Sequence, residues 1–398
     1  MINEKNVQLG KNRSTIRELF EYGKKRKAEI GAENVYDFSL GNPSVPAPDE
    51  VREALNGIIN TCDPVLLHGY TSAQGDYYVR ETLANQTNKK FATNLNADCF
   101  YMTCGAAASL TITLNALLNE GDEVIVFAPY FPEYKVFVEN AGGKFIVAQT
   151  AEKTFDIDLS KLEEVLSPKT KAVIINSPNN PSGVVYGKEC IKKLCTALKN
   201  HNKKYGTSVY IIADEPYREL VYDKGVEVPY IMNYYDRSIV CYSYSKSLSL
   251  PGERIGYIAV NNEMEEFSEV YAAVCGAGRA LGFVCAPNLF QQLVKKVCDK
   301  TSDISIYKNN RDKLYSALTE YGYEVVRPDG AFYMFVKALE PDAFAFAERA
   351  KEYELLLVAG DDFGVKGYVR ISYCVSPEML EKSLPAFKAL AERYKLQQ

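Results

Sequence analysis

The chain has 398 residues, of which 47% are hydrophobic and 24% are charged, and its formal net charge is −5 at pH 7. This composition excludes a disordered or fibrous protein, and the length exceeds the size at which one hydrophobic core keeps growing, so we expect two structural units. Lys and Arg residues are scattered among Asp and Glu and form no basic stripe, so neither nucleic acid nor a membrane surface is an expected partner.

Residues 1–10 contain no apolar run behind a basic stretch, and no apolar run in the chain approaches the length that crosses a bilayer. The ten cysteines form no C-x-x-C pair, and we interpret them as reduced, buried thiols. These features predict a cytoplasmic protein. The two histidines, His68 and His201, have no second candidate ligand nearby in the sequence, so we expect no metal site and no Ser-His-Asp triad.

The predicted elements begin with an amphipathic helix at residues 16–30, which we expect to pack beside the C-terminal part of the chain, and a first strand at 36–40. Strands and a long helix then alternate, at 123–127, 172–176, 188–205, 209–213 and 238–242. Alternation of short β-rich runs with helices is typical of a mostly parallel sheet that helices cover on both faces.

From about Pro287 the pattern changes to one long helical stretch through Glu320, followed by short strands at 332–336 and 368–372 and a closing helix from Ser376. This pattern indicates a smaller α+β unit. We therefore predict a three-layer α/β large domain with a mostly parallel central sheet at residues 45–286. A small domain would be formed by residues 1–44 together with 287–398.

Polar side chains follow three of the predicted strands, in the runs Asn176 to Pro181, Asp214 to Tyr217 and Ser243 to Lys246. In open α/β sheets the carboxyl ends of the strands form the edge at which ligands bind. Lys246 lies among hydroxyls, and Arg254 follows eight residues later. A Lys amine of lowered pKa forms a Schiff base with an aldehyde, and an Arg with nearby Ser hydroxyls fits a phosphate. An aldehyde together with a phosphate describes pyridoxal 5′-phosphate.

Ordered motifs along nearly the whole chain resemble the class I/II aminotransferases of the fold type I pyridoxal-phosphate superfamily. They are Gly41-Asn42-Pro43, Tyr70 before Gly75, Gly105-Ala106-Ala107, Asn176 to Gly183, Asp214 to Tyr217, Ser243 to Gly256, and Arg370. The resemblance implies an enzyme that exchanges an amino group between an L-α-amino acid and a 2-oxo acid by a ping-pong mechanism.

The resemblance also implies a role for each matching residue around the cofactor ring. Lys246 would form the Schiff base and then carry a proton between the substrate and the cofactor. Asp214 would pair with the pyridine nitrogen and keep it protonated. Asn180 and Tyr217 would hydrogen-bond the phenolic oxygen of the cofactor. Phe131 would stack on the ring, and its neighbour Tyr130 would do so if the register differs by one residue.

Around the phosphate the resemblance implies a cup of backbone N–H groups at a helix N-terminus, two hydroxyls and one guanidinium. Its members are Ala106, Ala107, Ser243, Ser245 and Arg254. Tyr70 matches a residue that reaches the phosphate of the neighbouring subunit. The resemblance therefore implies a homodimer whose active sites lie at the interface.

Arg370 matches the residue that binds the α-carboxylate of the substrate, assisted by Asn180 and the backbone of Gly41. Because Arg370 and Lys246 come from different predicted domains, we expect substrate binding to draw the domains together. Arg279 lies in the region where relatives that favour dicarboxylic substrates carry a second cation, but it does not align cleanly. We interpret Arg279 as a surface or interface residue paired with an acid.

Two other functions remain open. A pyridoxal-phosphate-dependent carbon–sulfur β-lyase uses the same fold, and the motifs do not separate it from an aminotransferase. A non-catalytic regulator that binds the cofactor would carry an additional N-terminal DNA-binding domain, for which a first strand at 36–40 leaves no room. Each motif alone also has a structural explanation, such as a turn or a surface lysine. Their order and their placement at strand ends favour the cofactor site.

Overall fold

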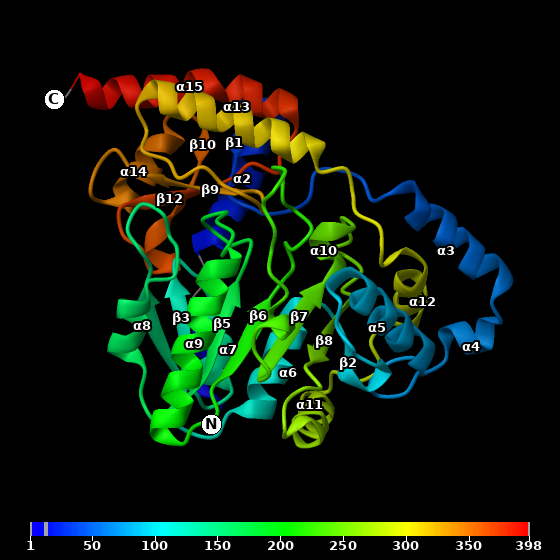
Figure 1. Ribbon diagram of the computed structural model, residues 1–398. Coiled ribbons are helices and arrows are strands. Elements are labelled where there is room, and N and C mark those ends of the chain that lie inside the picture. Colours follow the sequence, from blue (N-terminus) through cyan, green and yellow to red (C-terminus); the bar gives the residue numbers. More distant parts are fainter. Residues whose placement is uncertain (1, 12–14, 397–398) are drawn as a thin grey trace.

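The computed structural model describes residues 2–11 and 15–396. Its centre is a seven-stranded sheet in the order β2-β8-β7-β6-β5-β3-β4, flanked by helices (Figure 1). The strands are β2 (Phe100–Thr103), β3 (Glu123–Ala128), β4 (Lys144–Gln149), β5 (Thr170–Asn176), β6 (Tyr210–Asp214), β7 (Ser238–Ser243) and β8 (Gly256–Val260). The strand β8 runs in the direction opposite to the other strands of this sheet and is antiparallel to both β2 and β7. The predicted mostly parallel α/β sheet is confirmed.

Both faces of this sheet are buried, and successive side chains along each strand point to opposite faces. On β3, Val124 and Val126 belong to one core cluster, whereas Ile125 and Phe127 belong to another. The first cluster includes α6 (Ala106–Leu117), α7 (Glu133–Asn140) and α11 (Phe267–Leu281). The second includes α5 (Tyr77–Phe91), α8 (Leu159–Val165), α9 (Lys188–Tyr205) and α12 (Asn288–Val297). The two clusters define the two layers of helices.

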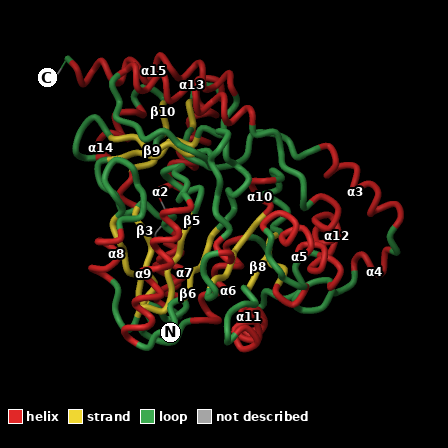
Figure 2. The backbone as a smooth tube through the Cα atoms, in the orientation of Figure 1, coloured by secondary structure: helices red, strands yellow, loops and turns green. Residues whose placement is uncertain are grey.

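A smaller sheet lies apart from the central one, as the separate strands near the top of Figure 2 show. Its order is β11-β12-β9, all antiparallel, and a two-stranded parallel pair joins β1 to β10. These strands are β1 (Tyr36–Asp37), β9 (Tyr333–Lys337), β10 (Leu355–Leu356), β11 (Val358–Ala359) and β12 (Tyr368–Ser372). The helices α13 (Ser305–Tyr321) and α15 (Pro377–Lys395) lie side by side over them, with α14 (Ala343–Lys351) nearby.

The N-terminal part of the chain packs beside C-terminal strands, as expected for the helix predicted at 16–30. That helix is α2 (Thr15–Ile30), and Lys27 Nζ lies 2.6 Å from Asp37 Oδ2. A side chain at Gly23 would collide with Leu356, so the helix approaches β10 closely. The remaining helices are α1 (Glu4–Lys11), α3 (Asp49–Thr61), α4 (Pro64–His68) and α10 (Tyr244–Ser247).

Two predicted elements differ from the structure. The strand expected at 36–40 is only two residues long, and it pairs with β10 instead of joining the central sheet. The helix expected from Pro287 through Glu320 is broken between α12 and α13. In the break, Ser302 N donates to Ser247 O at 2.8 Å, and Asp303 Oδ1 accepts from Ser305 N at 2.9 Å. The first bond ties the backbone of the break to α10, and the second lets the Asp303 side chain take a backbone N–H at the start of α13, as Asp side chains commonly do at helix starts.

The cysteine interpretation also needs one correction. All ten cysteines are free thiols, but Cys62, at the end of α3, is exposed, and five others are only partly buried; the four buried ones are Cys99, Cys195, Cys241 and Cys374. No helix within residues 2–11 and 15–396 has the length and apolar character needed to cross a membrane.

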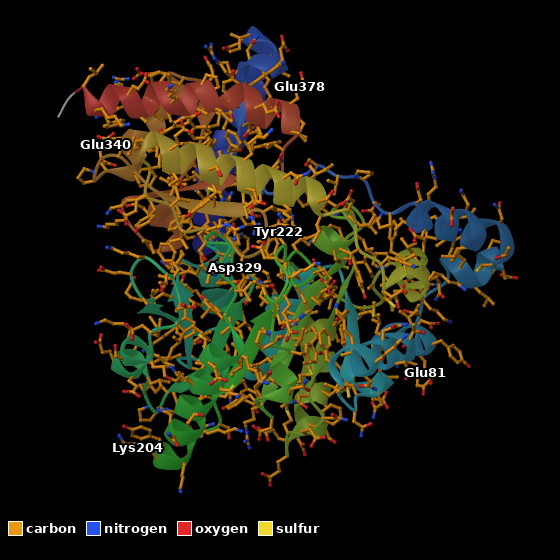
Figure 3. The ribbon with its side chains drawn as sticks, turned by 45° about the horizontal axis from the view of Figure 1, so that its top comes forward. Glu81, Lys204, Tyr222, Asp329, Glu340 and Glu378 are labelled. Carbon is orange, nitrogen blue, oxygen red and sulfur yellow. The ribbon has the colours of Figure 1, made fainter. Side chains whose placement is uncertain are left out.

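A buried arginine joins the C-terminal part of the chain to a loop that follows β6. Arg311 of α13 is fully buried and donates to both carboxylate oxygens of Asp223, at 2.9 and 3.0 Å. Tyr222 and Asp329 lie beside each other in the same region (Figure 3). Arg311 and Arg327, which also donates to Asp223, hold the pKa of that carboxyl well below its usual range. At pH values above the ordinary pKa of Asp, the ion pair therefore stabilises the folded state. This contribution is lost as the pH falls toward the lowered pKa of Asp223.

We predict that Arg311→Ala lowers the free energy of unfolding by about 3 kcal/mol, because it leaves a carboxylate at a half-buried site without its main partner. Urea unfolding at neutral pH measures this loss. The matched variant Arg327→Ala removes a more exposed partner of the same carboxylate and should cost less than about 1 kcal/mol. Equal effects of the two variants would contradict the assigned role of Arg311.

Candidate active site

The polar ends of β5, β6 and β7 meet at one edge of the central sheet, because these strands are parallel neighbours. A cavity of about 290 Å³ lies there. Every residue predicted for the cofactor or the substrate lines it, except Tyr70. These residues are Gly41, Ala106, Ala107, Phe131, Asn180, Asp214, Tyr217, Ser243, Ser245, Lys246, Arg254 and Arg370.

Lys246 lies in the short helix α10, directly after β7, and its amine reaches into the cavity. Nζ donates to Gly41 O at 2.5 Å. Burial lowers the pKa of Lys246 to about 8, and the charges of Arg254 and Arg370 act in the same direction. A substantial fraction of this amine is therefore neutral near physiological pH, which is the form that attacks an aldehyde.

Asp214 is the last residue of β6 and is buried. Its Oδ2 accepts from Tyr134 Oη at 2.5 Å, and Asn176 Nδ2 donates to its backbone oxygen at 2.8 Å. Its Oδ1 is buried and has no hydrogen-bond partner among the described residues. Burial raises the pKa of Asp214 to about 7, and the bond from Tyr134 opposes this rise. A buried acceptor without a donor fits the protonated nitrogen of a pyridine ring.

The first turn of α6 forms a cradle for an anion. Gly105 precedes this turn with φ +91°, and a Cβ added to it would lie 2.8 Å from Arg254 Nη2, so no side chain fits between the guanidinium and the backbone. Arg254 Nη1 in turn lies 3.5 Å from Ser245 Oγ. Free N–H groups at a helix start, hydroxyls and a guanidinium together fit a phosphate. The cavity therefore matches both ends of pyridoxal 5′-phosphate.

Arg370 on β12 forms the opposite wall. It is buried, Nη1 donates to Asn180 Oδ1 at 3.2 Å, Nη2 donates to Ser39 O at 2.5 Å, and Nε has no partner. Its guanidinium lies over the rings of Tyr333 and Phe363. No acidic side chain among the described residues pairs with it, and burial lowers its pKa. A buried cation without an anion fits a carboxylate ligand.

Several residues of the site were not predicted from the sequence. Tyr333 lines the cavity, and its Oη lies 2.9 Å from Tyr217 Oη. Burial raises the pKa of Tyr333 to about 12, so both phenols stay protonated and can donate. Ile16 and Leu40 line the same cavity. The sequence contains one indirect signal for Tyr333, which is the glycine at position 41. No larger residue fits there, because a Cβ would collide with the Tyr333 hydroxyl.

Two predicted residues lie elsewhere. Tyr70 is 97% exposed and lines a separate hollow near Pro287, so its contact with a neighbouring subunit stays a prediction. Arg279 is exposed in the last turn of α11, and the acidic partner that we expected for it is not found among the described residues. Phe131 lines the cavity, whereas Tyr130 does not line it. Phe131 is therefore the better placed of the two, and its stacking on the cofactor stays a prediction.

The chain belongs to the aminotransferase class I and II family, whose model matches residues 33–387. It is similar to the probable aspartate aminotransferase of Methanocaldococcus jannaschii, with 31% identity over 95% of this chain and 97% of that protein. It is also similar to the aspartate aminotransferase of Thermotoga maritima, with 33% identity over 93% and 95%. An amino transferase structure from Eubacterium rectale shares 57% identity, covers 99% of both chains and has a TM-score of 0.97.

These relationships establish the class of reaction. The protein is a pyridoxal-phosphate-dependent enzyme of fold type I that transfers amino groups between small molecules. The alternative of a carbon–sulfur lyase is not favoured, since the relatives are aminotransferases.

We predict that Tyr134→Phe weakens cofactor binding to the apoenzyme about 10-fold at neutral pH, because it removes a hydrogen bond to a buried carboxylate. Without this donor the pKa of Asp214 rises further above its usual range, so the pH below which the carboxylate becomes neutral moves upward. Spectroscopic titration with pyridoxal phosphate across pH measures both effects. Tyr235→Phe, a buried tyrosine that donates to Val209 O, serves as the control. An unshifted pH dependence in Tyr134→Phe would show that this bond does not tune Asp214.

Proposed function

We propose that Lys246, Asp214 and Tyr217 are the catalytic residues with which this aminotransferase moves an amino group from an L-α-amino acid to a 2-oxo acid. One observation carries the proposal. The amine of Lys246 lies in the same cavity as an unpaired acceptor on Asp214 and an unpaired cation on Arg370. These three groups match the requirements of amine exchange, electron withdrawal and carboxylate binding.

The remaining lining residues would hold the cofactor. Pyridoxal phosphate, when bound, supplies an aldehyde for amine exchange and a ring that accepts electron density. Asp214 would accept the N–H of that ring through its free Oδ1, while Phe131 would cover one ring face. Asn180 and Tyr217 would donate to the phenolic oxygen. The phosphate group would be bound by Ala106, Ala107, Ser243, Ser245 and Arg254.

Lys246 would act as both anchor and base. Because burial lowers the pKa of this amine to about 8, the neutral form can take a proton from the α-carbon of the substrate and return it to the cofactor side. Arg370 would bind the α-carboxylate through its free Nε and one Nη group, with Asn180 and the Gly41 backbone beside it. This contact fixes which α-carbon bond faces Lys246.

We propose residues 45–286 as a large domain and residues 1–44 with 287–398 as a small one, and we expect them to approach each other when Arg370 binds substrate. The helix α12 packs against α3 and α5 in a helix layer of the central sheet, so the connection from α12 to α13 would form the joint between the two domains. A cytoplasmic location is part of this proposal, supported by ten cysteines that are all free thiols.

We predict that Lys246→Ala lowers transamination by about three orders of magnitude or more while the far-ultraviolet circular dichroism stays unchanged. Lys246→Arg should behave in the same way, because a guanidinium forms no Schiff base. The assay follows the visible spectrum of the enzyme with pyridoxal phosphate before and after an amino acid is added without any 2-oxo acid. Wild type should convert to the pyridoxamine form, and the variants should not. Near-normal conversion by Lys246→Ala would reject the assignment, and release of pyruvate and ammonia by wild type would indicate a lyase.

A homodimer is also proposed, with an interface around α4. Val65 and Leu66 of this helix are 79% and 77% exposed, and Ile59 of α3 and Tyr70, two residues after α4, are exposed as well. An exposed apolar patch of this kind marks a protein contact. Tyr70 would then reach the phosphate of the partner subunit.

We predict that Leu66→Asp yields a monomer in sedimentation velocity and loses activity, because a charge at the interface must be desolvated on association. Tyr70→Phe should keep the dimer and weaken cofactor binding about 5-fold, by the loss of one hydrogen bond. Phe344→Asp changes a partly exposed phenylalanine on α14 and serves as the control. A fully active Leu66→Asp monomer would exclude a shared site.

A further inference from the structure

A second cavity, of about 330 Å³, lies next to α5 and the end of α12. Side chains that point in opposite directions at the ends of β6 and β7 separate it from the active site. Asp214 and Ser243 line the active site, whereas the adjacent residues Glu215, Tyr242 and Tyr244 line the second cavity. The two cavities therefore lie on opposite sides of the same stretches of backbone. None of the roles proposed above uses the second one.

The inner wall of this cavity is built from buried polar groups. Arg218 donates to both carboxylate oxygens of Glu215, each side chain is 5% exposed, and Arg218 Nη1 also donates to Val228 O at 2.8 Å. The guanidinium lies over the rings of Phe91 and Tyr230. The hydrogen-bonding groups of this ion pair are already used by the protein, so the pair forms part of the wall and does not need a ligand. The Tyr230 hydroxyl is different, since it is buried and has no hydrogen-bond partner among the described residues.

The lining includes acceptors, Gln86 and the Asp299 carboxylate, and Asp299 Oδ2 lies 4.0 Å from Lys300 Nζ; the unpartnered buried hydroxyl of Tyr230 is a donor. Burial raises the pKa of Tyr230 and Tyr257, so these phenols stay protonated. The carboxylate of Glu219 is already used, because Lys90 Nζ lies 3.0 Å from Oε1 and Tyr242 Oη lies 2.8 Å from Oε2. Lys89 is exposed at the rim and has no partner among the described residues. The cavity thus offers a free hydroxyl inside, a free ammonium at its mouth and tyrosine rings between them.

The same cavity contacts the turn that carries Lys246. Tyr242 Oη lies 2.9 Å from Ser247 Oγ, and Ser247 follows Lys246 in α10. The backbone oxygen of Ser247 accepts from Ser302 N, in the connection between α12 and α13. Residues 298–301 of this connection line the cavity. A molecule bound there would touch both the lysine turn and the joint to the C-terminal part of the chain.

We propose that this second cavity binds a small aromatic carboxylate that carries another oxygen acceptor on its ring. The ring would lie among the tyrosines, the carboxylate would face Lys89 at the mouth, and the second oxygen would accept from Tyr230. A volume of about 330 Å³ accommodates one or two fused rings.

Cys298 provides a reporter inside the cavity, since it lines the wall as a partly buried free thiol. The holoenzyme is alkylated with N-ethylmaleimide at alkaline pH, and the rate at Cys298 is followed by peptide mass spectrometry with increasing 6-hydroxy-2-naphthoate. Labelling of Cys298 should slow about 5-fold or more at saturation, because a bound ring covers the thiol. The exposed Cys62 should react at an unchanged rate. Glutarate is kept at saturation so that Arg370 of the active site does not bind the probe.

The probe without a hydroxyl, 2-naphthoate, identifies the inner contact. Wild type should bind 6-hydroxy-2-naphthoate about 5-fold more tightly than 2-naphthoate, and Tyr230→Phe should abolish this difference. Lys89→Ala should weaken both probes about 3-fold, whereas Lys203→Ala, at the matching position in the last turn of α9, should weaken neither. Absence of protection at Cys298 overturns the proposal. So does a preference between the probes that survives in Tyr230→Phe, or stronger protection by the cationic 2-naphthamidine.

Discussion

Arg370 is buried without an acidic partner among the described residues, and its hydrogen bonds connect three distant segments of the chain. Through Ser39 O it holds the segment after β1, through Asn180 it holds the loop after β5, and it is itself part of β12. Burial of a guanidinium is costly, and here a carbonyl, an amide and two aromatic rings offset only part of that cost. The free Nε is the part that remains for a ligand. In the proposed function, affinity for a carboxylate and cohesion of the fold would thus depend on this one side chain.

Burial also shifts the pKa values of Lys246 and Asp214, and it shifts them in opposite directions. It lowers the pKa of Lys246 to about 8 and raises that of Asp214 to about 7. Both groups move toward their neutral forms, because each charged form lacks a full set of partners in the cavity. In the proposed function, the cofactor would bring a cationic ring nitrogen to Asp214 and an aldehyde to Lys246. It would therefore supply a partner to both groups.

Much of this site follows from the sequence because its residues are placed by local rules. Asp214 ends one strand of the central sheet, and Asn180 and Lys246 follow two neighbouring parallel strands, so their convergence is a property of the sheet. Tyr333 and Ile16 escaped prediction because they belong to other elements, and their approach depends on how the smaller sheet packs on the larger one. The break between α12 and α13 was not predicted for a similar reason, since a tertiary hydrogen bond from Ser302 to Ser247 helps to fix it. A contact made by Tyr70 requires a second chain and lies outside what one sequence specifies.

The pairing of β1 with β10 has a consequence for synthesis on the ribosome. Tyr36 is made early and its partner Leu355 late, so this two-stranded pair forms only after most of the polypeptide has been translated. The central sheet and the lysine turn emerge well before β12 brings in Arg370. A nascent chain at that stage would possess the anion cradle and the amine of Lys246, yet the wall that carries Arg370 would still be inside the exit tunnel. A cofactor that bound during translation would therefore occupy an incomplete site that is open to solvent.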